Sequence, residues 1–455
     1  MSSSPSRPAG TPAPHFTDLM ARLHSRAAKI GVVGLGYVGL PLVRVAAERG
    51  FSVLGFDIDR AKIDVINAGG SYLRHIAAAS IAALRETGRL EATDDFSRLA
   101  QVDVVIVCVP TPLTRQREPD LSFVAGTTRT IAEYLRPGQL IVLESTTYPG
   151  TTRELLQPIL EAGGLESGRD FLLAFSPERE DPGNPDFGTA DIPKVVGGDG
   201  PEALAAARAF YDAVTARTIP VSSPEAAEAV KLTENIFRAV NIALVNELKV
   251  VYEAMGIDVW EVIEAAKSKP FGYMPFYPGP GLGGHCIPID PFYLTWKARE
   301  YDLTTRFIEL AGEINTAMPA RVVDKAIAAL SERRGLAIRG ARTLVVGVAY
   351  KKNVDDLRES PALKIVELLS KCGAQVDFHD PIVAELPPTR QHPELAGQRS
   401  APLTPATLER TDMALICTDH DAIDYALLVA HCPLVIDTRN VCARLGLPGD
   451  RVVKA

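Results

Sequence analysis

Several patterns that mark common classes of protein are missing from this chain of 455 residues. No apolar run approaches the roughly 18 residues that span a membrane, so we expect no membrane partner. The net charge is −8, which leaves no overall basic footprint for nucleic acid. None of the six cysteines forms a CxxC pair, and no cysteine/histidine cluster has the spacing of a zinc site. We therefore expect reduced thiols, no metal and a cytoplasmic location.

The composition is that of an ordinary globular protein. Apolar residues make up 46% and charged residues 23% of the chain, and the length predicts about three domains. The N-terminal residues are rich in serine, proline and alanine and lack the charged-then-apolar order of a signal peptide. We expect a disordered tail over residues 1–26.

Strands that alternate with helical patterns predict a doubly wound α/β domain over residues 27–220. An apolar helix is expected over 40–49, directly after the first strand. The expected strands are 28–33, 52–56, 102–109, 140–144, 171–175 and 194–196. This alternation predicts a parallel sheet that helices cover on both faces.

A long helix is expected to open a helical middle domain over residues 221–330. Ser223 suits the N-cap and Pro224 the first helical position, and the apolar periodicity continues to Gly256. This helix of roughly 32 residues would be about 48 Å long. We expect it to connect two domains and to provide a homodimer surface.

The alternation begins again over residues 331–455. Strands are expected at 343–348, 375–378, 413–417 and 434–436, with a helix at 360–372. The turn after the first of these strands, Gly347-Val348-Ala349-Tyr350, lacks the later glycines of a dinucleotide fingerprint. The predicted fold is therefore α/β, with two doubly wound Rossmann-like domains joined by a long central helix and a helical middle domain.

The run Gly34-Leu35-Gly36-Tyr37-Val38-Gly39 follows a predicted strand and opens a helix. Asp57 comes directly after the next predicted strand along the chain. Such glycines allow a tight turn and close approach of a pyrophosphate, and the acid can bind a ribose diol. The motif predicts NAD in preference to NADP; a purely structural glycine turn is the alternative.

Hydroxyl side chains follow two further strands, in Val109-Pro110-Thr111-Pro112 and Glu144-Ser145-Thr146-Thr147. Ligands of open α/β sheets bind outside the carboxyl ends of the strands, so Thr111 and Thr146 are candidates for cofactor or substrate contacts. Ordinary turn and cap chemistry is the alternative for each residue.

Lys231 and Asn235 are four residues apart on the long helix and share one of its faces. They form a candidate polar site, although a lysine on a helix is more often solvated.

The most informative stretch places Cys286 in a run of small residues, Gly279 to Asp290. A thiol on such a loop can be presented to a substrate as a nucleophile. The alternatives are a buried small apolar side chain for Cys286 and a turn cap for Asp290. A second charged run, Lys351 to Pro361, is either a solvated loop or a phosphate-recognising segment.

Seven motifs occur in one order: GLGYVG with the later aspartate, VPTP, ESTT, SPER, KLTEN, GLGGHCIPID and KKNVDDLRES. Over about residues 27 to 445 the chain resembles the UDP-glucose/GDP-mannose dehydrogenase family. The resemblance implies an NAD-binding domain, a dimerising middle domain and a UDP-sugar-binding domain. It also implies a four-electron oxidation of the sugar C6 alcohol to a carboxylate.

The resemblance further implies roles for individual residues. Cys286 would be the nucleophile, and Thr146 and Glu178 would hold or activate water. The residues expected around the reacting oxygen are Lys231, Asn235 and Asp290. Those expected to contact the cofactor are the glycine motif with Tyr37 and Val38, Asp57, Thr111, Thr146 and Arg358. Those expected to contact the substrate are Lys231, Asn235, Phe276, Tyr277, Gly283, Lys352 and Arg439.

Two departures from the family pattern bear on the substrate. Ile289 stands where enzymes acting on UDP-glucose carry a lysine, and Pro182 stands where they carry a second glutamate. We therefore expect UDP-N-acetylglucosamine, oxidised for surface polysaccharide synthesis. UDP-N-acetylmannosamine, UDP-N-acetylgalactosamine and UDP-glucose remain alternatives. Outside the class, the alternatives are a two-electron hydroxyacid dehydrogenase and a non-catalytic nucleotide-binding regulator.

Overall fold

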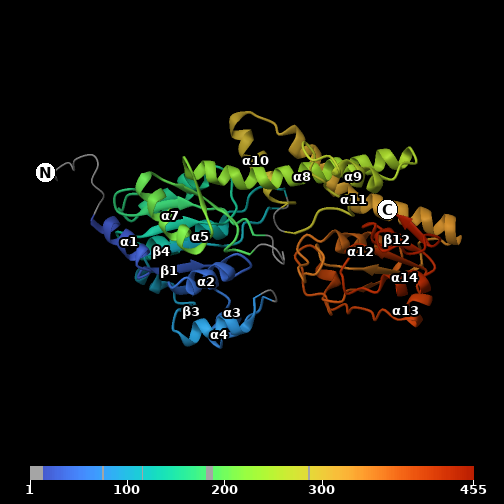
Figure 1. The fold of residues 1–455 in the computed structure, drawn as a ribbon, viewed down its shortest axis with the longest axis horizontal. Helices are drawn as coiled ribbons and strands as arrows, with labels where there is room; N and C mark the ends of the chain where they lie inside the picture. The colour runs from blue at the N-terminus through green and yellow to red at the C-terminus, as the bar shows by residue number, and fades with distance from the viewer. Residues whose placement is uncertain (1–13, 74–75, 115, 181–187, 285–286) are drawn as a thin grey trace. The chain divides into compact units, whose positions relative to one another are not determined.

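The computed structural model describes residues 14–73, 76–114, 116–180, 188–284 and 287–455 (Figure 1). The chain forms two compact units. The first comprises Met1–Glu234 and Phe292–Asp302, and the second comprises Asn235–Pro291 and Leu303–Ala455. In the described part of the chain, no helix is long and apolar enough to cross a membrane.

The first unit is built on an eight-stranded sheet with the order β3-β2-β1-β4-β5-β6-β7-β8. Its strands are β1 Lys29–Val33, β2 Ser52–Phe56, β3 Leu90–Thr93, β4 Val104–Val107, β5 Leu140–Leu143, β6 Leu172–Phe175, β7 Lys194–Gly198 and β8 Thr218–Val221. The central strands are buried on both faces, as their continuous apolar sequences predict. All neighbouring strands are parallel except β6 and β7.

Helices cover both faces of this sheet. They are α1 Pro14–His24, α2 Gly39–Glu48, α3 Arg60–Asn67, α4 Ala78–Glu86, α5 Ser122–Tyr134, α6 Gln157–Glu161 and α7 Pro201–Val214, with the short 3-10 helices η1 Phe96–Gln101 and η3 Arg299–Tyr301 and the π-helical segment η2 Thr152–Leu156. Alternate residues of β4 enter different cores: Val104 and Ile106 pack with α1, α2 and α7, whereas Val105 and Val107 pack with α5 and α6. Two further helices, α8 Pro224–Ala254 and α10 Asp290–Ala298, continue across the boundary between the units.

The second unit contains a five-stranded, fully parallel sheet with the order β10-β9-β11-β12-β13. Its strands are β9 Arg342–Val346, β10 Gln375–His379, β11 Met413–Ile416, β12 Val435–Asp437 and β13 Val452–Lys454. Its helices are α9 Val259–Lys267, α11 Arg306–Arg334, α12 Pro361–Lys371, α13 Pro405–Glu409, α14 Tyr425–His431 and α15 Val441–Arg444, with the turn η4 Pro393–Leu395. The prediction of two Rossmann-like sheets with a helical middle region is confirmed.

One expectation about the first sheet is wrong. The alternating pattern predicts a wholly parallel sheet, but β7 runs antiparallel to β6. A parallel pair needs a crossover connection, usually a helix, whereas an antiparallel pair does not. The described residues between β6 and β7 contain no helix, so the chain returns alongside β6 in the opposite direction.

The second sheet repeats the first turn of the dinucleotide motif, but the acid at the end of its next strand, Asp380, accepts hydrogen bonds from the protein itself. Gly347 after β9 has φ 78°, comparable to φ 93° at Gly34 after β1. Asp380, at the end of β10, accepts the Val348 N–H at 2.8 Å, as Asp57 accepts the Leu35 N–H at 2.9 Å.

The Asp380 carboxylate, however, is already saturated. It also accepts the N–H groups of Ile382 and Val383, and it pairs with the fully buried His420 at 3.1 Å. Four donors leave this acid no free acceptor for a ribose hydroxyl. The second sheet therefore keeps the turn of a dinucleotide site without its ribose acceptor.

Candidate functional site

The three glycines after β1 meet different surroundings. A Cβ at Gly34 would lie 2.5 Å from the Cys108 carbonyl oxygen, and one at Gly39 would lie 1.9 Å from the Gly34 carbonyl oxygen. A Cβ at Gly36 would meet no atom within 4 Å. Gly34 and Gly39 therefore allow the strand and helix to pack, while the backbone at Gly36 faces open space where a pyrophosphate can approach.

Helix α2 begins beside this space without a capping side chain or an acidic residue in its first turn. The unsatisfied amides and the positive end of the helix dipole favour a phosphate there. Asp57, at the end of β2, is held by the N–H groups of Leu35 and Asp59, both at 2.9 Å. Each carboxylate oxygen keeps a lone pair for a ribose hydroxyl, so the residues present fit NAD.

The ends of β4 and β5 are linked by a side chain that the sequence motif already contains. The Ser145 hydroxyl donates to the Val109 carbonyl oxygen at 2.7 Å. Thr111 is buried, and its carbonyl oxygen accepts the Tyr293 hydroxyl at 3.0 Å. Thr146 is half-buried, whereas the neighbouring Thr147 is fully buried and its hydroxyl has no partner among the described residues. Thr147 therefore offers a buried hydroxyl without a described partner at this strand end, a residue that the sequence motifs do not predict as a contact.

Glu178, just after β6, belongs to a buried ionic cluster. The Lys194 ammonium lies 2.7 Å from a Glu178 carboxylate oxygen and 2.9 Å from one of Glu144. Tyr211 donates its hydroxyl to the other oxygen of Glu144. Burial raises the pKa of Glu144, whereas Lys194 overcomes the effect of burial and lowers the pKa of Glu178. Sequence analysis missed Lys194 and Tyr211; the available signal was a lysine opening an otherwise apolar strand.

Lys231 lies on α8 in the first unit and is buried to 8% exposure. Its charge also contributes to the lowered pKa of Glu178, which indicates that the two groups lie near each other. The alternative of a solvated helical lysine is therefore wrong for Lys231. Asn235, one turn further along α8, lies in the second unit.

In the second unit, Asn235 donates its side-chain amide to Asp290 at 2.5 Å. Asp290 is 1% exposed and begins α10. Cys286, expected as the nucleophile, and His285 lie outside the described residues. The chain is anchored on either side of them, because the Gly284 N–H donates to the Arg358 carbonyl oxygen at 2.9 Å and Asp290 is held by Asn235.

The glycine-rich run is closely packed on this unit. A Cβ at Gly283 would lie 2.6 Å from the Tyr350 Cβ, and one at Gly279 would lie 2.7 Å from the Arg439 guanidinium. The Gly279 N–H donates to the Asn246 side chain at 3.0 Å. Small residues are therefore required here by the approach of two other segments, and the run is held in place against them.

The charged run 351–361 is internally paired. Lys352 forms a 2.7 Å ion pair with Asp421, and Arg358 forms a 2.6 Å pair with Asp356. Both cations are partly exposed, so water screens these pairs and each contributes at most about 1 kcal/mol to stability. They can exchange these partners for a phosphate at little cost.

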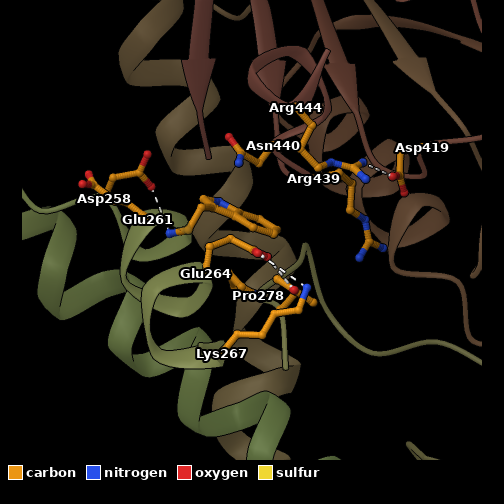
Figure 2. Close-up of a pocket in the computed structure, with 11 residues that line it drawn as sticks. Asp258, Glu261, Glu264, Lys267, Pro278, Asp419, Arg439, Asn440 and Arg444 are labelled. Atoms are coloured by element: carbon orange, nitrogen blue, oxygen red, sulfur yellow. Dashed lines mark hydrogen bonds and ion pairs between the residues drawn. The ribbon is translucent and has the colours of Figure 1, made fainter. Parts of the chain in front are cut away.

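A cavity of about 760 Å³ lies between α9 and the carboxyl end of the second sheet (Figure 2). Trp260 and Tyr277 stack in its wall, with ring centroids 5.7 Å apart. Arg439 enters from the sheet side; its Nε donates to the Cys417 carbonyl oxygen at 2.7 Å, and no described carboxylate pairs with its guanidinium. The cavity therefore combines an aromatic wall with an unpaired cation. Arg439 and Tyr277 are two of the expected substrate contacts, whereas Trp260, one of only two tryptophans, is not among them.

Phe276 is half-buried and lies next to this wall, with its ring in a T-shaped contact with that of Phe237. In the part of the chain that the structure describes, no group of three or more His, Cys, Asp or Glu residues could hold a metal ion.

Lys249 on α8 is a buried lysine whose ammonium has no described hydrogen-bond partner. Burial, and then the charges of Lys325 and Arg439, lower its pKa from 10.5 to about 8. Below pH 8, burial of the charged Lys249 ammonium destabilises the folded protein to the full extent. As the pH rises from about 8 to 10.5, Lys249 loses its proton in the folded state before it does so in the unfolded state, and this destabilisation disappears. This difference corresponds to roughly 3 kcal/mol.

We therefore expect Lys249→Met to raise the free energy of unfolding at pH 7 and to remove the gain in stability between pH 8 and 10.5. Chemical denaturation at several pH values measures both effects. Lys371→Met, which removes an exposed lysine paired with Glu367 and not among the groups that shift Lys249, is the control and should leave the gain in place. A variant at Lys249 that is less stable at pH 7 would contradict the assignment.

Profiles of three domains match the chain in order. They are the NAD binding domain (residues 28–215), the central domain (225–317) and the UDP binding domain (344–444) of the UDP-glucose/GDP-mannose dehydrogenase family. The dinucleotide turn lies within the first match, the Asn235–Asp290 pair within the second, and Arg439 within the third.

Individual relatives act on different sugars. UDP-N-acetyl-D-glucosamine 6-dehydrogenase of Pseudomonas aeruginosa is 39% identical over 359 residues, which cover 78% of this chain and 83% of the relative. The solved structure of UDP-D-ManNAc dehydrogenase from Pyrococcus horikoshii is 33% identical, with TM-score 0.81 over 90% of this chain and 95% of that one. NDP-N-acetyl-D-galactosaminuronic acid dehydrogenase from Methanosarcina mazei Go1 is 30% identical, with TM-score 0.77 over 96% and 97%.

Proposed function

We propose that this chain oxidises the C6 alcohol of UDP-N-acetylglucosamine to the carboxylate. The chain belongs to the UDP-glucose/GDP-mannose dehydrogenase family and is an NAD-dependent nucleotide-sugar dehydrogenase, which is the basis of the proposal. The observation that carries the proposal is the buried Asn235–Asp290 pair that anchors the chain just after Cys286. Matches to all three family domains argue against a two-electron hydroxyacid dehydrogenase.

The proposed chemistry uses Cys286 as a covalent nucleophile. Loss of a hydride from C6 and a proton from its hydroxyl gives the aldehyde, to which the thiolate adds. Loss of a second hydride from this adduct gives a thioester, and water hydrolyses it to the carboxylate and the free thiol. NAD would be held at the glycine turn and Asp57 and would supply the hydride acceptor, with one NAD for each of the two hydrides.

Lys231, Asn235 and Asp290 are proposed to surround the reacting oxygen. A lysine there can stabilise an oxyanion and lower the pKa of the nearby thiol, and both effects favour the thiolate route. Thr146 and Glu178 are proposed to hold the hydrolytic water, with the free hydroxyl of Thr147 beside them.

The second unit is proposed to hold the nucleotide. Trp260 and Tyr277 provide an aromatic surface, and the unpaired Arg439 provides a donor for the nucleotide moiety. Lys352 and Arg358 supply further cations once they leave their carboxylate partners. We also assign Phe276 and Gly283 to the substrate loop, and Thr111 and Arg358 to the cofactor side.

The choice of an N-acetylated sugar rests on sequence differences and is supported by the relatives. Ile289 is buried and replaces a lysine expected for UDP-glucose, whereas Pro182 lies outside the described residues. NADH formation against a panel of UDP-glucose, UDP-N-acetylglucosamine and its manno and galacto epimers tests the choice. The highest kcat/KM is expected with UDP-N-acetylglucosamine; oxidation of UDP-glucose alone would contradict it.

We further propose that the enzyme is a homodimer formed through α8. Phe237, Leu244 and Val251 recur every seven residues on this helix and are 49%, 50% and 45% exposed. Met255 and Ile257 extend the exposed apolar surface. A stripe of this kind favours association with a second copy of the same helix.

Leu244→Asp is therefore expected to convert the dimer into a monomer, because the interface would bury an unpaired charge. Sedimentation velocity at micromolar concentration measures the change. Leu445→Asp, which places the same charge at a 57% exposed leucine outside the stripe, is the control and should remain dimeric. A wild-type monomer, or a dimer that survives the Leu244 substitution, would contradict the proposed surface.

A further inference from the structure

Among the described residues, three donors hold the carboxylate of Glu178. One oxygen accepts the N–H groups of Arg179 at 2.7 Å and Glu180 at 2.6 Å, and the other accepts the Lys194 ammonium at 2.7 Å. A carboxylate has about four acceptor positions, so about one remains. The side chain is 13% exposed, which leaves access for a single small donor such as water.

The Lys194 ammonium neutralises part of the charge of two buried carboxylates, which cannot both remain ionised without this cation. Its side chain is 4% exposed, and that of Glu144, on the other side of it, is fully buried. Like charges at one buried site raise a carboxyl pKa, whereas an adjacent cation lowers it by about 1–3 pH units. The ammonium therefore determines the charge state of the cluster.

We propose that Lys194 is a positioning residue that keeps Glu178 ionised and fixed, so that this carboxylate orients the hydrolytic water and does not take its proton. The inference rests on the proposed function. In the hydrolytic step, the water oxygen bonds to the acyl carbon as the carbon–sulfur bond breaks. One water proton passes to the Cys286 sulfur, and the other stays on the product acid, which then ionises.

The lysine is best tested where no second carboxylate can take up a proton. Lys194→Met alone leaves Glu144 and Glu178 together, and the fully buried Glu144 would be protonated first. In the Glu144→Gln background, the further substitution Lys194→Met removes one charged neighbour of Glu178, the lysine itself, and leaves no Glu144 carboxyl to take up the proton instead. The pair E144Q and E144Q/K194M therefore isolates the effect of Lys194, and the double variant keeps the net charge of the wild-type cluster.

The measurement is the rate of uronate formation in a single turnover as a function of pH. E144Q is expected to keep the wild-type profile through neutral pH. E144Q/K194M is expected to lose activity as the pH falls, with the midpoint of that loss about 1–3 pH units higher than in E144Q. E144Q/K194R, which restores a cation, should return the midpoint toward that of E144Q. Equal midpoints in E144Q and E144Q/K194M would overturn the proposal, even if both are slow.

A matched lysine elsewhere in the same unit controls for loss of stability. Lys297 is 5% exposed and bridges Glu154 at 2.6 Å and Glu300 at 2.7 Å. Lys297→Met should lower the melting temperature without moving the pH profile. A shift of the profile in this variant equal to that in E144Q/K194M would also contradict a specific role for Lys194.

Infrared spectroscopy separates this proposal from the proposed function. If the wild-type protein oxidises no UDP-sugar, the function fails but the charge of Glu178 can still be measured. In a pH titration, the carbonyl band of protonated Glu178, identified as the part of the signal that a further Glu178→Gln substitution removes, should appear about 1–3 pH units higher in E144Q/K194M than in E144Q. Appearance of that band at the same pH in both variants would overturn the role of Lys194 independently of activity.

Discussion

Cys286→Ser is expected to reduce uronate formation by a factor on the order of 10³ or more. A serine hydroxyl is not ionised at neutral pH, so it cannot capture the aldehyde or form the acyl intermediate as a thiolate does. The anchored chain at Gly284 and Asp290 should be unaffected, so substrate binding is expected to persist. Uronate formation by mass spectrometry and substrate binding by thermal shift measure the two properties separately.

Cys372→Ser is the matched control for Cys286→Ser. Cys372 is a half-buried free thiol at the end of α12 and belongs to none of the proposed sites. This variant should retain wild-type turnover. Normal steady-state uronate formation by Cys286→Ser would contradict the covalent route.

Lys231→Met is expected to lower kcat by about 10²–10³, the usual effect of removing one donor from a developing oxyanion. Lys231 is buried and lies one helical turn from Asn235, and methionine keeps most of the length of the side chain without its charge. In the proposed site the Lys231 cation favours the Cys286 thiolate, so the same substitution should make this thiol less reactive near neutral pH. Alkylation of Cys286 by iodoacetamide as a function of pH therefore provides a second measurement.

Lys249→Met provides the comparison for Lys231→Met. Lys249 is a second buried lysine on α8, several turns closer to the end of this helix. Its loss should leave both kcat and the alkylation profile of Cys286 close to those of the wild type. Equal losses of kcat in the two variants would show that removing any buried charge from α8 is sufficient to lower kcat. That result would contradict the role of Lys231.

The parts predicted well from sequence are those whose physical requirements are local. The glycine turn and Asp57 are close in sequence and follow consecutive strands, so their spacing alone places them at one edge of the sheet. The long helix from Pro224 follows from its cap residues and apolar periodicity; the Ser223 hydroxyl indeed accepts the Ala226 N–H at 3.3 Å.

The parts that were missed depend on contacts distant in sequence. Lys194 lies 50 residues from Glu144 and 16 from Glu178, and only the antiparallel return of β7 beside β6 brings the three together. The short strands β3, β8 and β13 lack a strong apolar pattern; β13, for example, is only half-buried. Trp260 and Arg439 belong to segments far apart in the sequence, and no local pattern joins them in one cavity.

The ratio of NADH to uronate formed by the wild-type enzyme tests the central claim most directly. Oxidation of UDP-N-acetylglucosamine through a thioester on Cys286 transfers four electrons as two hydrides. The account therefore predicts two NADH for each sugar consumed, with the carboxylate as the product. A ratio of one, with an aldehyde or ketone as the product, would contradict it.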